Sequence, residues 1–333
     1  MQFHGDHPGY VPGRALNLVC VVDRAWSGEI ANRLRRIPRA HASRTIVCAF
    51  EPGRTTLDAV ATIAADADPR GGGFAVLRET VVLTVGPEHL RQLDRVVDPL
   101  VVTDVATLVW SPHGHPEALD ALTAGTGGGR GLAQVVLLDS VDEPDVRAAL
   151  ERACALHRRG DVVDLAWLRS APWRERVAAA FDPPSRRREL DTLSAVRVLF
   201  RPGSETAALL VVGWLSSRLG WRPALLAQRS GRLSGRVRAR RGEVDVDLEP
   251  VEDLSVPGLA GIEVESALGS RLALVRGTGG LAAHRRERDG REAHWTVLGA
   301  SRGEAGILGE GIRQALMRDE VYPEALRAAR ALV

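Results

Sequence analysis

Two hydrophobic patterns alternate along the first half of the chain. Runs that are apolar almost throughout predict buried strands at 16–23, 44–50, 79–85, 104–110 and 132–139. Apolar residues spaced three and four positions apart predict helices at 26–37, 88–101, 116–124 and 143–159. The pattern of 55–66 fits a helix about as well as a strand. Because strands that alternate with helices form a largely parallel sheet, we expect an N-terminal α/β domain over residues 12–160.

The pattern changes in the second half, over residues 161–333. Residues 161–190 predict short junction helices and a charged linker, which begins at Asp182-Pro183-Pro184. After the linker we predict, in order, a strand at 194–200, a helix at 204–220, short strands and hairpins over 223–298 and a helical region from Glu304. We therefore expect a C-terminal α+β domain with an antiparallel meander.

One arginine-rich stretch, GRVRARRGEVDVDLE, has the alternation of a half-exposed hairpin. Folding it at a turn over Arg241-Gly242 predicts Arg238 opposite Asp245 and Arg236 opposite Asp247. The acids of the second strand then neutralise the arginines of the first. We therefore expect no nucleic-acid partner.

Composition limits the classes of protein further. The 333 residues are 45% hydrophobic and 26% charged, as in ordinary globular proteins, and the formal net charge is +2. So small a charge favours neither nucleic acid nor a membrane surface, and no apolar run approaches the roughly 18 residues of a membrane span. The N-terminal residues lack a signal-peptide pattern, so we expect a cytoplasmic protein with no membrane partner.

The basic residues and the cysteines exclude more chemistry. All 44 basic residues are arginine, so neither Schiff-base catalysis nor a P-loop lysine is available. Cys20, Cys48 and Cys154 are odd in number and include no C-x-x-C pair, which argues against a disulfide framework.

The ends of two predicted strands are candidate ligand sites. The first strand continues as DRAWSGEIAN, without the G-x-G-x-x-G turn that binds dinucleotides, so we expect no cofactor. His113 and His115 follow the strand that ends at Trp110, at the sheet edge where open α/β folds bind ligands. Two histidines without a nearby acid or cysteine are weak evidence for zinc. We interpret them as part of a solvated loop and expect no metal.

A third candidate matches the nucleophile motif G-x-S-x-G at residues 299–303. A serine hydrolase of that type needs an acid and then a histidine after the serine, whereas the last histidine here is His294. We therefore expect no catalytic residues. The start of the following helix leaves Ser301 and Arg302 as candidate anion-binding residues, with plain helix capping as the other interpretation.

The stretch DLAWLRSAPWRERVAAAF, residues 164–181, is unusual in a chain with 4% aromatic residues. Asp164 is expected to cap a short turn, and Ser170 to cap a second helix with Pro172 in its first turn. Two such pieces would bring the two tryptophans of the stretch close together.

Trp167 and Trp173 are accompanied by Arg169 and Arg174, which can stack on or beside the rings. Tryptophan with arginine is typical of interaction hot spots, and buried tryptophan is typical of a packed domain junction. The residues alone leave both interpretations open.

The same stretch carries a family resemblance. Residues 164–169 followed by Pro172-Trp173-Arg174 are similar to the central D-L-A-W-x-R-x-x-P-W-R signature of the glucose-6-phosphate dehydrogenase assembly protein family, OpcA. Near the C-terminus, Asp319, Glu320 and Tyr322 belong to a stretch that resembles the D-E-V-Y-x-E-A-L ending of that family. Residues 108–112 and 13–19 add weaker similarities.

The resemblance implies a non-catalytic protein whose partner is glucose-6-phosphate dehydrogenase. It would promote assembly or allosteric activation of that enzyme in the oxidative pentose phosphate pathway, with the two motifs at the partner contact or at the domain junction. Self-association stays open. The alternative is a sugar-phosphate-binding protein or enzyme that uses Ser301 and Arg302. Since the chain begins close to its first strand, we expect no role for the N-terminal extension common in the family.

Overall fold

The computed structural model describes residues 16–35, 43–66, 76–125, 131–252, 254, 256–298, 303–315 and 317–333. Contacts divide the chain into two compact units, each assembled from separate segments. The first unit comprises 1–138, 156–163 and 308–318, and the second comprises 139–155, 164–307 and 319–333. A single boundary near residue 160 stays a prediction.

The first unit is built on a seven-stranded sheet in the order β3-β4-β2-β1-β5-β6-β7. Its strands are β1 (Leu16–Asp23), β2 (Ser43–Phe50), β3 (Asp58–Asp66), β4 (Val76–Val85), β5 (Thr107–Trp110), β6 (Val135–Leu138) and β7 (Asp161–Asp164). The segment with an ambiguous pattern is the edge strand β3, which pairs antiparallel with β4. Without β3, the order is the 3-2-1-4-5-6 arrangement of dinucleotide-binding folds.

Central strand β1 pairs in parallel with β2 and β5, and its residues 16–22 are all buried. This burial explains its continuous apolar run, because a central parallel strand is covered on both faces. The helices of this part of the chain are η1 (Arg24–Trp26), α2 (Ser27–Arg35), α3 (Pro87–Leu90), α4 (Leu93–Val97), η2 (Asp98–Leu100), α5 (Pro116–Ala124) and α6 (Val146–His157). The single helix predicted over 88–101 is therefore broken into three short pieces.

The second unit contains an eight-stranded sheet in the order β15-β14-β13-β12-β8-β11-β10-β9. Its strands are β8 (Leu193–Phe200), β9 (Ala227–Arg229), β10 (Arg232–Ala239), β11 (Gly242–Pro250), β12 (Leu259–Ser266), β13 (Arg271–Gly277), β14 (Gly280–Arg286) and β15 (Glu292–Leu298). Strands β12 to β15 form an antiparallel meander, while β8 pairs in parallel with β11. The expected fold class, a largely parallel α/β sheet followed by an α+β part with a meander, is confirmed.

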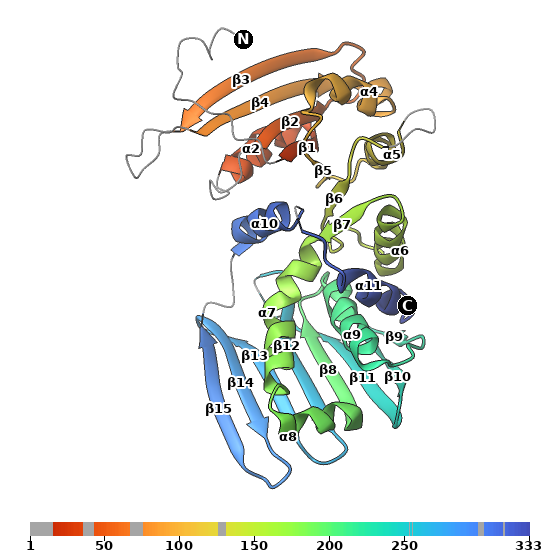
Figure 1. The fold of residues 1–333 in the computed structure, drawn as a ribbon. Helices are drawn as coiled ribbons and strands as arrows, with labels where there is room; N and C mark the ends of the chain where they lie inside the picture. Colours follow the sequence, from red (N-terminus) through yellow and green to blue (C-terminus); the bar gives the residue numbers. More distant parts are fainter. Residues whose placement is uncertain are drawn as a thin grey trace. The chain divides into compact units, whose positions relative to one another are not determined.

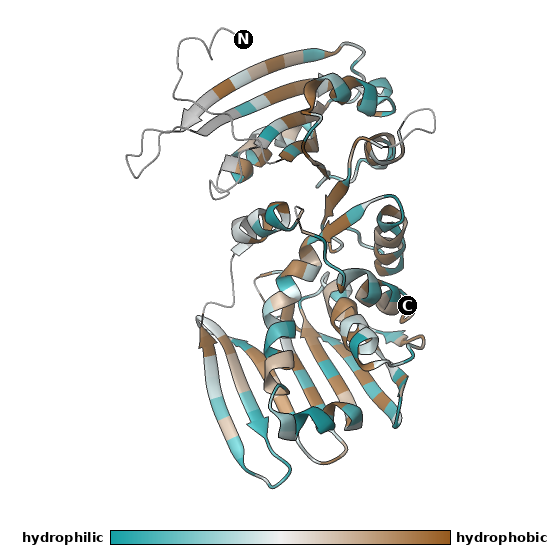
Figure 2. Cartoon of the chain, in the orientation of Figure 1, coloured by the Kyte–Doolittle hydropathy of each residue, from teal (hydrophilic) through white to brown (hydrophobic). Residues whose placement is uncertain are grey.

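Helices pack on one face of this second sheet (Figure 1). The remaining helices of the chain are α7 (Leu165–Ala180), α8 (Pro184–Arg187), η3 (Arg188–Thr192), α9 (Glu205–Leu219), α10 (Gly303–Gln314) and α11 (Tyr322–Arg330). In β8, Val196, Val198 and Phe200 are buried while Arg197 is exposed, and the central strands alternate in hydropathy (Figure 2). One face of the sheet is therefore core and the other is polar. No helix among the described residues is both long and apolar enough to cross a membrane.

The β10–β11 hairpin forms, but the predicted register was wrong by two residues. Arg236 pairs with Asp245, and Arg238 pairs with Glu243. The turn lies one residue earlier than predicted, because Gly242 already pairs with Ala239. A two-residue shift keeps every side chain on its face of the sheet, so hydrophobic alternation alone could not distinguish the two registers.

Candidate functional site

The central motif lies on α7, whose start is held by Asp164. The Oδ1 atom of Asp164 accepts the backbone N–H groups of Ala166, at 3.0 Å, and Ser140, at 3.1 Å. Asp164 is thus the N-cap, as predicted. The prediction of two helical pieces was wrong, because α7 is continuous and contains Pro172 in its interior. Ser170 is not a cap, and its hydroxyl donates to the carbonyl of Trp167 at 2.8 Å.

Packing explains why the helix continues through the proline. Trp167 and Trp173 are each only 2% exposed, so burial of the helix offsets the backbone hydrogen bond that proline cannot make. Six positions along a helix separate two side chains by about 120° around its axis. The two rings accordingly have different neighbours: Trp167 contacts Tyr322, and Trp173 lies under the guanidinium of Arg276.

Arg174 lies directly on Trp167. Its Cζ atom is 3.2 Å from the ring centroid, Nη2 donates to the Trp167 carbonyl at 3.2 Å, and Nε donates to the hydroxyl of Ser170 at 3.0 Å. Burial lowers the pKa of Arg174 to about 10, although the charge of Asp319 opposes this shift. Arg174 therefore stays charged at neutral pH, and it is half-buried against the ring of Trp167.

Arg169 forms an ion pair with Asp139. Its two terminal nitrogens donate to the two carboxylate oxygens at 2.8 and 2.6 Å. The exposed fractions of the two side chains are 10% and 8%. A nearly buried bidentate pair fixes the position of both groups, and removal of either one would leave an uncompensated charge.

The C-terminal motif completes the same network. The Oδ2 atom of Asp319 accepts the indole N–H of Trp167 at 2.7 Å, and Oδ1 accepts the backbone N–H groups of Val321 and Tyr322. The hydroxyl of Tyr322 donates to Oδ2 of Asp164 at 3.0 Å. The two sequence motifs therefore meet in one buried network that joins the first turn of α7 to the start of α11.

Burial sets the electrostatics of this network. It raises the pKa of Asp164 to about 6, with a further contribution from the charge of Asp139, while hydrogen bonds from Ser140 and Ala166 oppose the rise. Burial and the neighbouring Asp164 also raise the pKa of Tyr322 well above its ordinary value. Tyr322 is therefore a neutral donor to a carboxyl group that changes its charge in mildly acidic solution.

The other predicted residues differ in their surroundings. Pro172 is half-buried, and Glu320 is exposed beside the network. Ser301 and Arg302 lie outside the described residues. The network itself is too deeply buried to receive a substrate, since Asp164 and Tyr322 are each 1% exposed. Its arrangement can hold helices in position.

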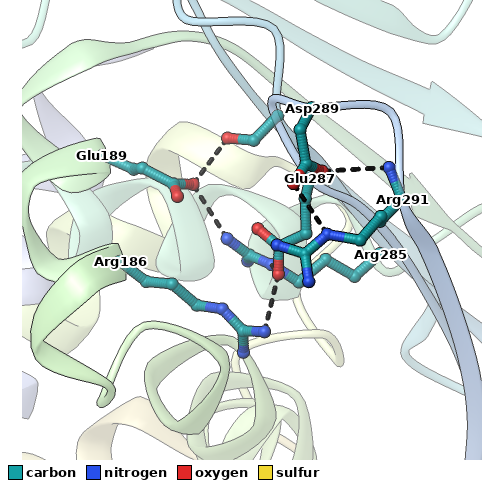
Figure 3. Close-up of polar contacts among 7 residues, drawn as sticks. Arg186, Glu189, Arg285, Glu287, Asp289 and Arg291 are labelled. Atoms are coloured by element: carbon teal, nitrogen blue, oxygen red, sulfur yellow. Dashed lines mark hydrogen bonds and ion pairs between the residues drawn. The ribbon is translucent and has the colours of Figure 1, made fainter.

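A second polar cluster was not predicted from the sequence (Figure 3). Arg285 on β14 is 1% exposed and forms ion pairs with Glu189, at 2.8 Å, and Glu287, at 3.0 Å. Arg186 pairs with the same Glu287 at 2.6 Å. Burial alone would raise the pKa of Glu287, but the hydrogen bond and charge of Arg285, with the charge of Arg186, hold it below the ordinary value.

This cluster borders an open cavity of about 690 Å³. Its lining mixes acids and arginines: Ser185, Arg186, Glu189, Glu287, Arg288, Asp289, Arg291, Glu292 and Ala293. Because both charges are present in similar number, the cavity favours neither an anion nor a cation. The buried part of the cluster connects η3 to β14.

A third group lies at the carboxyl ends of β1 and β5. There Asp23, the last residue of β1, is close to His113 and His115. The sequence placed the histidines at this edge but not the acid, which is 90 residues from His113. The sequence does show that the first strand ends in the carboxylate of Asp23. Only the strand order shows that this end lies next to the end of β5, where the histidines follow.

The fold and these sites define a class of protein. It has the sheet of a dinucleotide-binding fold without the glycine-rich turn, and a second unit organised around a buried tryptophan–arginine network. The chain can be superimposed on a solved glucose-6-phosphate 1-dehydrogenase from Mycobacterium avium over 95% of its own length and 91% of that chain, with a TM-score of 0.55 and 10% identity. At that identity the likeness shows the fold alone.

The chain belongs to the glucose-6-phosphate dehydrogenase assembly protein family, OpcA. Residues 34–154 match the family model of the glucose-6-phosphate dehydrogenase subunit N-terminal domain, and residues 160–326 match that of the C-terminal domain. The chain is 27% identical over 158 residues to the OxPP cycle protein OpcA of Synechocystis sp., and 45% identical over 62 residues to that of Synechococcus elongatus. These matches cover 46% and 19% of this chain, and 32% and 14% of the relatives. The chain thus matches less than a third of the length of either relative.

Proposed function

We propose that this chain is a non-catalytic subunit that binds glucose-6-phosphate dehydrogenase and promotes its assembly or activity. The descriptions of the two matching domains support this partner, and the names of the relatives support a place in the oxidative pentose phosphate pathway. The dehydrogenase is the proposed partner, and the proposed role requires no cofactor or catalytic residue in this chain.

One observation carries the non-catalytic part of the proposal. The first strand ends in Asp23-Arg24-Ala25-Trp26-Ser27-Gly28, which keeps only the last glycine of a G-x-G-x-x-G turn. In a dinucleotide site the first two glycines make a tight turn and let the backbone approach the pyrophosphate. Here a carboxylate holds the first of these positions and would repel the pyrophosphate. This end of β1 therefore supports a chain that does not bind a dinucleotide there.

The buried network supports a bracing role for the two family motifs. Trp167, Trp173, Asp164 and Tyr322 are 1–2% exposed and have their partners within the second unit. We propose that they hold α7 and α11 in a fixed geometry, and that exposed residues beside them, such as Glu320, contact the dehydrogenase. The buried residues would then affect the dehydrogenase only indirectly, by fixing the shape of the surface that contacts it.

Mixing the two purified proteins tests the function directly. We expect a complex of higher mass by light scattering, and a change in dehydrogenase rate or substrate affinity that saturates with this chain. The chain alone, measured in the same way, reports self-association. Two independent masses with unchanged kinetics would contradict the proposal. Saturable thermal stabilisation of the chain by a sugar phosphate, without the enzyme, would favour the alternative of a sugar-phosphate-binding protein.

Two variants separate bracing from direct contact. Trp173→Phe removes a buried ring edge, so we expect lower thermal stability but normal enhancement of the dehydrogenase at a temperature where the variant is folded. Glu320→Arg changes an exposed charge, so we expect unchanged stability and weaker binding. Loss of enhancement in folded Trp173→Phe would assign the tryptophan to the contact itself.

A further inference from the structure

The first sheet has a switch point between β1 and β5. From β1 the chain continues to β2 on one side, and β5 later pairs on the other side of β1, with Cys20 opposite Trp110. In open α/β sheets, ligands bind in the crevice at this point, outside the carboxyl ends of the strands. In this chain the two strand ends carry Asp23 on one side and a His-Gly-His turn on the other.

The local backbone directs both imidazoles toward Asp23. Gly114 has a φ of 72°, a left-handed conformation that glycine adopts without strain, and it allows the tight turn between His113 and His115. The hydroxyl of Ser111 accepts the backbone N–H of His115 at 3.1 Å, which fixes the end of the turn. The turn therefore has a defined conformation, with Gly114 exposed.

The three side chains converge. The Nε2 atom of His115 lies 3.2 Å from Oδ1 of Asp23, and Nδ1 of His113 lies 3.9 Å from Oδ2. One nitrogen or oxygen from each residue lies within 4.8 Å of those of the other two. The side chains of His115 and His113 are 11% and 22% exposed, whereas that of Asp23 is 44% exposed, so the imidazoles are shielded and the carboxylate is reachable from solvent.

One ring nitrogen in the group is incompletely satisfied. Nε2 of His115 is buried and lies 3.2 Å from Oδ1 of Asp23, but the contact lacks the geometry of a full hydrogen bond, as is also the case for Nε2 of His284 on the β14–β15 hairpin. Phe50 packs against the same ring with a centroid separation of 5.2 Å, which limits its rotation. A buried polar atom without a hydrogen bond is costly, and a bound ion is one explanation for it.

We propose that Asp23, His113 and His115 form a binding site for a divalent transition-metal ion. Two imidazole nitrogens and one carboxylate oxygen suit Zn²⁺ and its first-row neighbours, whereas Mg²⁺ and Ca²⁺ prefer oxygen ligands. Nδ1 of His113 now accepts the backbone N–H of Asp23 at 3.0 Å, and metal binding would take over that lone pair. Three protein ligands leave at least one position for water or an anion.

The described chain contains a second group with the same residue types, on the β14–β15 hairpin. Glu292 lies 3.4 Å from His284 and 3.9 Å from His294. The two imidazoles are stacked with an interplanar angle of 3° and a centroid separation of 4.2 Å, and the ligand atoms of this group also lie within 4.8 Å of one another. The side chains of Glu292 and His294 are also 49% and 69% exposed. This hairpin group is therefore a matched control.

Zn²⁺ binding to this chain without an affinity tag tests the proposal. We expect the chelator-treated protein to bind one equivalent tightly by calorimetry, and anomalous diffraction at the zinc edge to place the ion beside Asp23. Asp23→Asn or His115→Gln removes a ligand, so each should weaken this binding by at least the roughly 10–100-fold that loss of an outer-shell partner costs. His284→Gln combined with His294→Gln should leave it unchanged.

Two results would overturn the proposal: no stoichiometric binding to the wild-type chain, or binding lost only in the hairpin variant. Because a replaced ligand could also destabilise the unit, circular dichroism and the melting temperature of each metal-free variant are recorded first. If a variant is unfolded, the anomalous signal of the wild-type crystal decides alone. The test involves no dehydrogenase, so its outcome is independent of the proposed function.

Discussion

Tyr322 donates its hydroxyl proton to the carboxylate of Asp164, 158 residues earlier in the chain, at 3.0 Å. Both residues belong to family motifs, and both are almost completely buried. With the Trp167–Asp319 hydrogen bond, this contact ties the first turn of α7 to the start of α11. The residues of the two motifs therefore depend on one another for buried hydrogen bonds.

Tyr322→Phe should lower the free energy of unfolding by about 1–3 kcal/mol, because it leaves a buried carboxylate oxygen without its donor. Urea denaturation at neutral pH measures this loss. Glu320→Gln is the matched control, since its side chain is exposed in the same motif, and we expect its effect to stay within about 0.5 kcal/mol. Equal stability of the two variants would contradict a stabilising role for the tyrosine hydroxyl.

The raised pKa of Asp164 predicts a pH dependence of stability. The pKa of Asp164 is about 6 in the folded chain and has its ordinary value of 3.8 in the unfolded chain. Between these two pH values, Asp164 is protonated in the folded chain but not in the unfolded chain. The contribution of Asp164 to stability should therefore fall as the pH rises from about 4 to about 6, and stay constant above. The difference between the two pKa values corresponds to about 3 kcal/mol.

Asp164→Asn isolates this contribution, because asparagine remains neutral at every pH. Relative to the variant, the wild-type protein should lose stability between pH 4 and 6 and show no further relative change up to pH 8. Parallel stability curves for the two proteins would mean that Asp164 titrates alike in the folded and unfolded chains.

Sequence patterns predicted the elements correctly where burial follows a regular pattern along the strand. β1 is covered on both faces, so its apolar run identified it, and the alternation of β8 reflects one buried and one polar face. The patterns failed where tertiary contacts decide. Pro172 indicated a helix start, yet the buried tryptophans around it keep α7 continuous.

The candidate sites likewise combine residues that the sequence identified with contacts that it did not predict. Every residue of the central motif was identified in the sequence, and so were Asp319 and Tyr322 of the second motif, but the contacts that join the two motifs were not predicted. Asp319 is 152 residues from Trp167, and the strand order that brings Asp23 to His113 is set by the packing of the whole sheet. Long-range pairs of this kind leave no periodic signal along the chain.

Gly213→Ala should destabilise the contact between α9 and α11. An added Cβ would lie 2.2 Å from the backbone carbonyl oxygen of Ala325 and 2.8 Å from the backbone nitrogen of Ala329, so the two helices would have to separate. We expect a loss of about 3 kcal/mol in thermal or urea unfolding, larger than the gain in helix propensity. Gly28→Ala in α2 is the control, because its Cβ would meet no atom within 4 Å and should stabilise slightly.

Arg285→Met should be strongly destabilising for an electrostatic reason. Methionine can fill the space of the buried stem beside Phe181, but Glu189 and Glu287 lose the guanidinium that compensates them. Removing one partner of a buried ion pair typically costs about 3–5 kcal/mol, most of it from the charge left behind. Arg291→Met is the matched control, because that side chain is 82% exposed in the same cluster.

The pH dependence distinguishes unpaired charge from lost packing in this variant. In the wild-type protein the pKa of Glu287 lies below its ordinary value, so its contribution to stability is present at neutral pH and lost as the pH falls through that pKa. In Arg285→Met the carboxylates of Glu189 and Glu287 lose their positive partner, so they should be easier to protonate. Their protonation at low pH should remove the repulsion between them. The stability difference between wild type and variant should therefore shrink from pH 7 to pH 4 in urea denaturation. A difference that stays constant over this range would assign the cost to packing of the arginine stem.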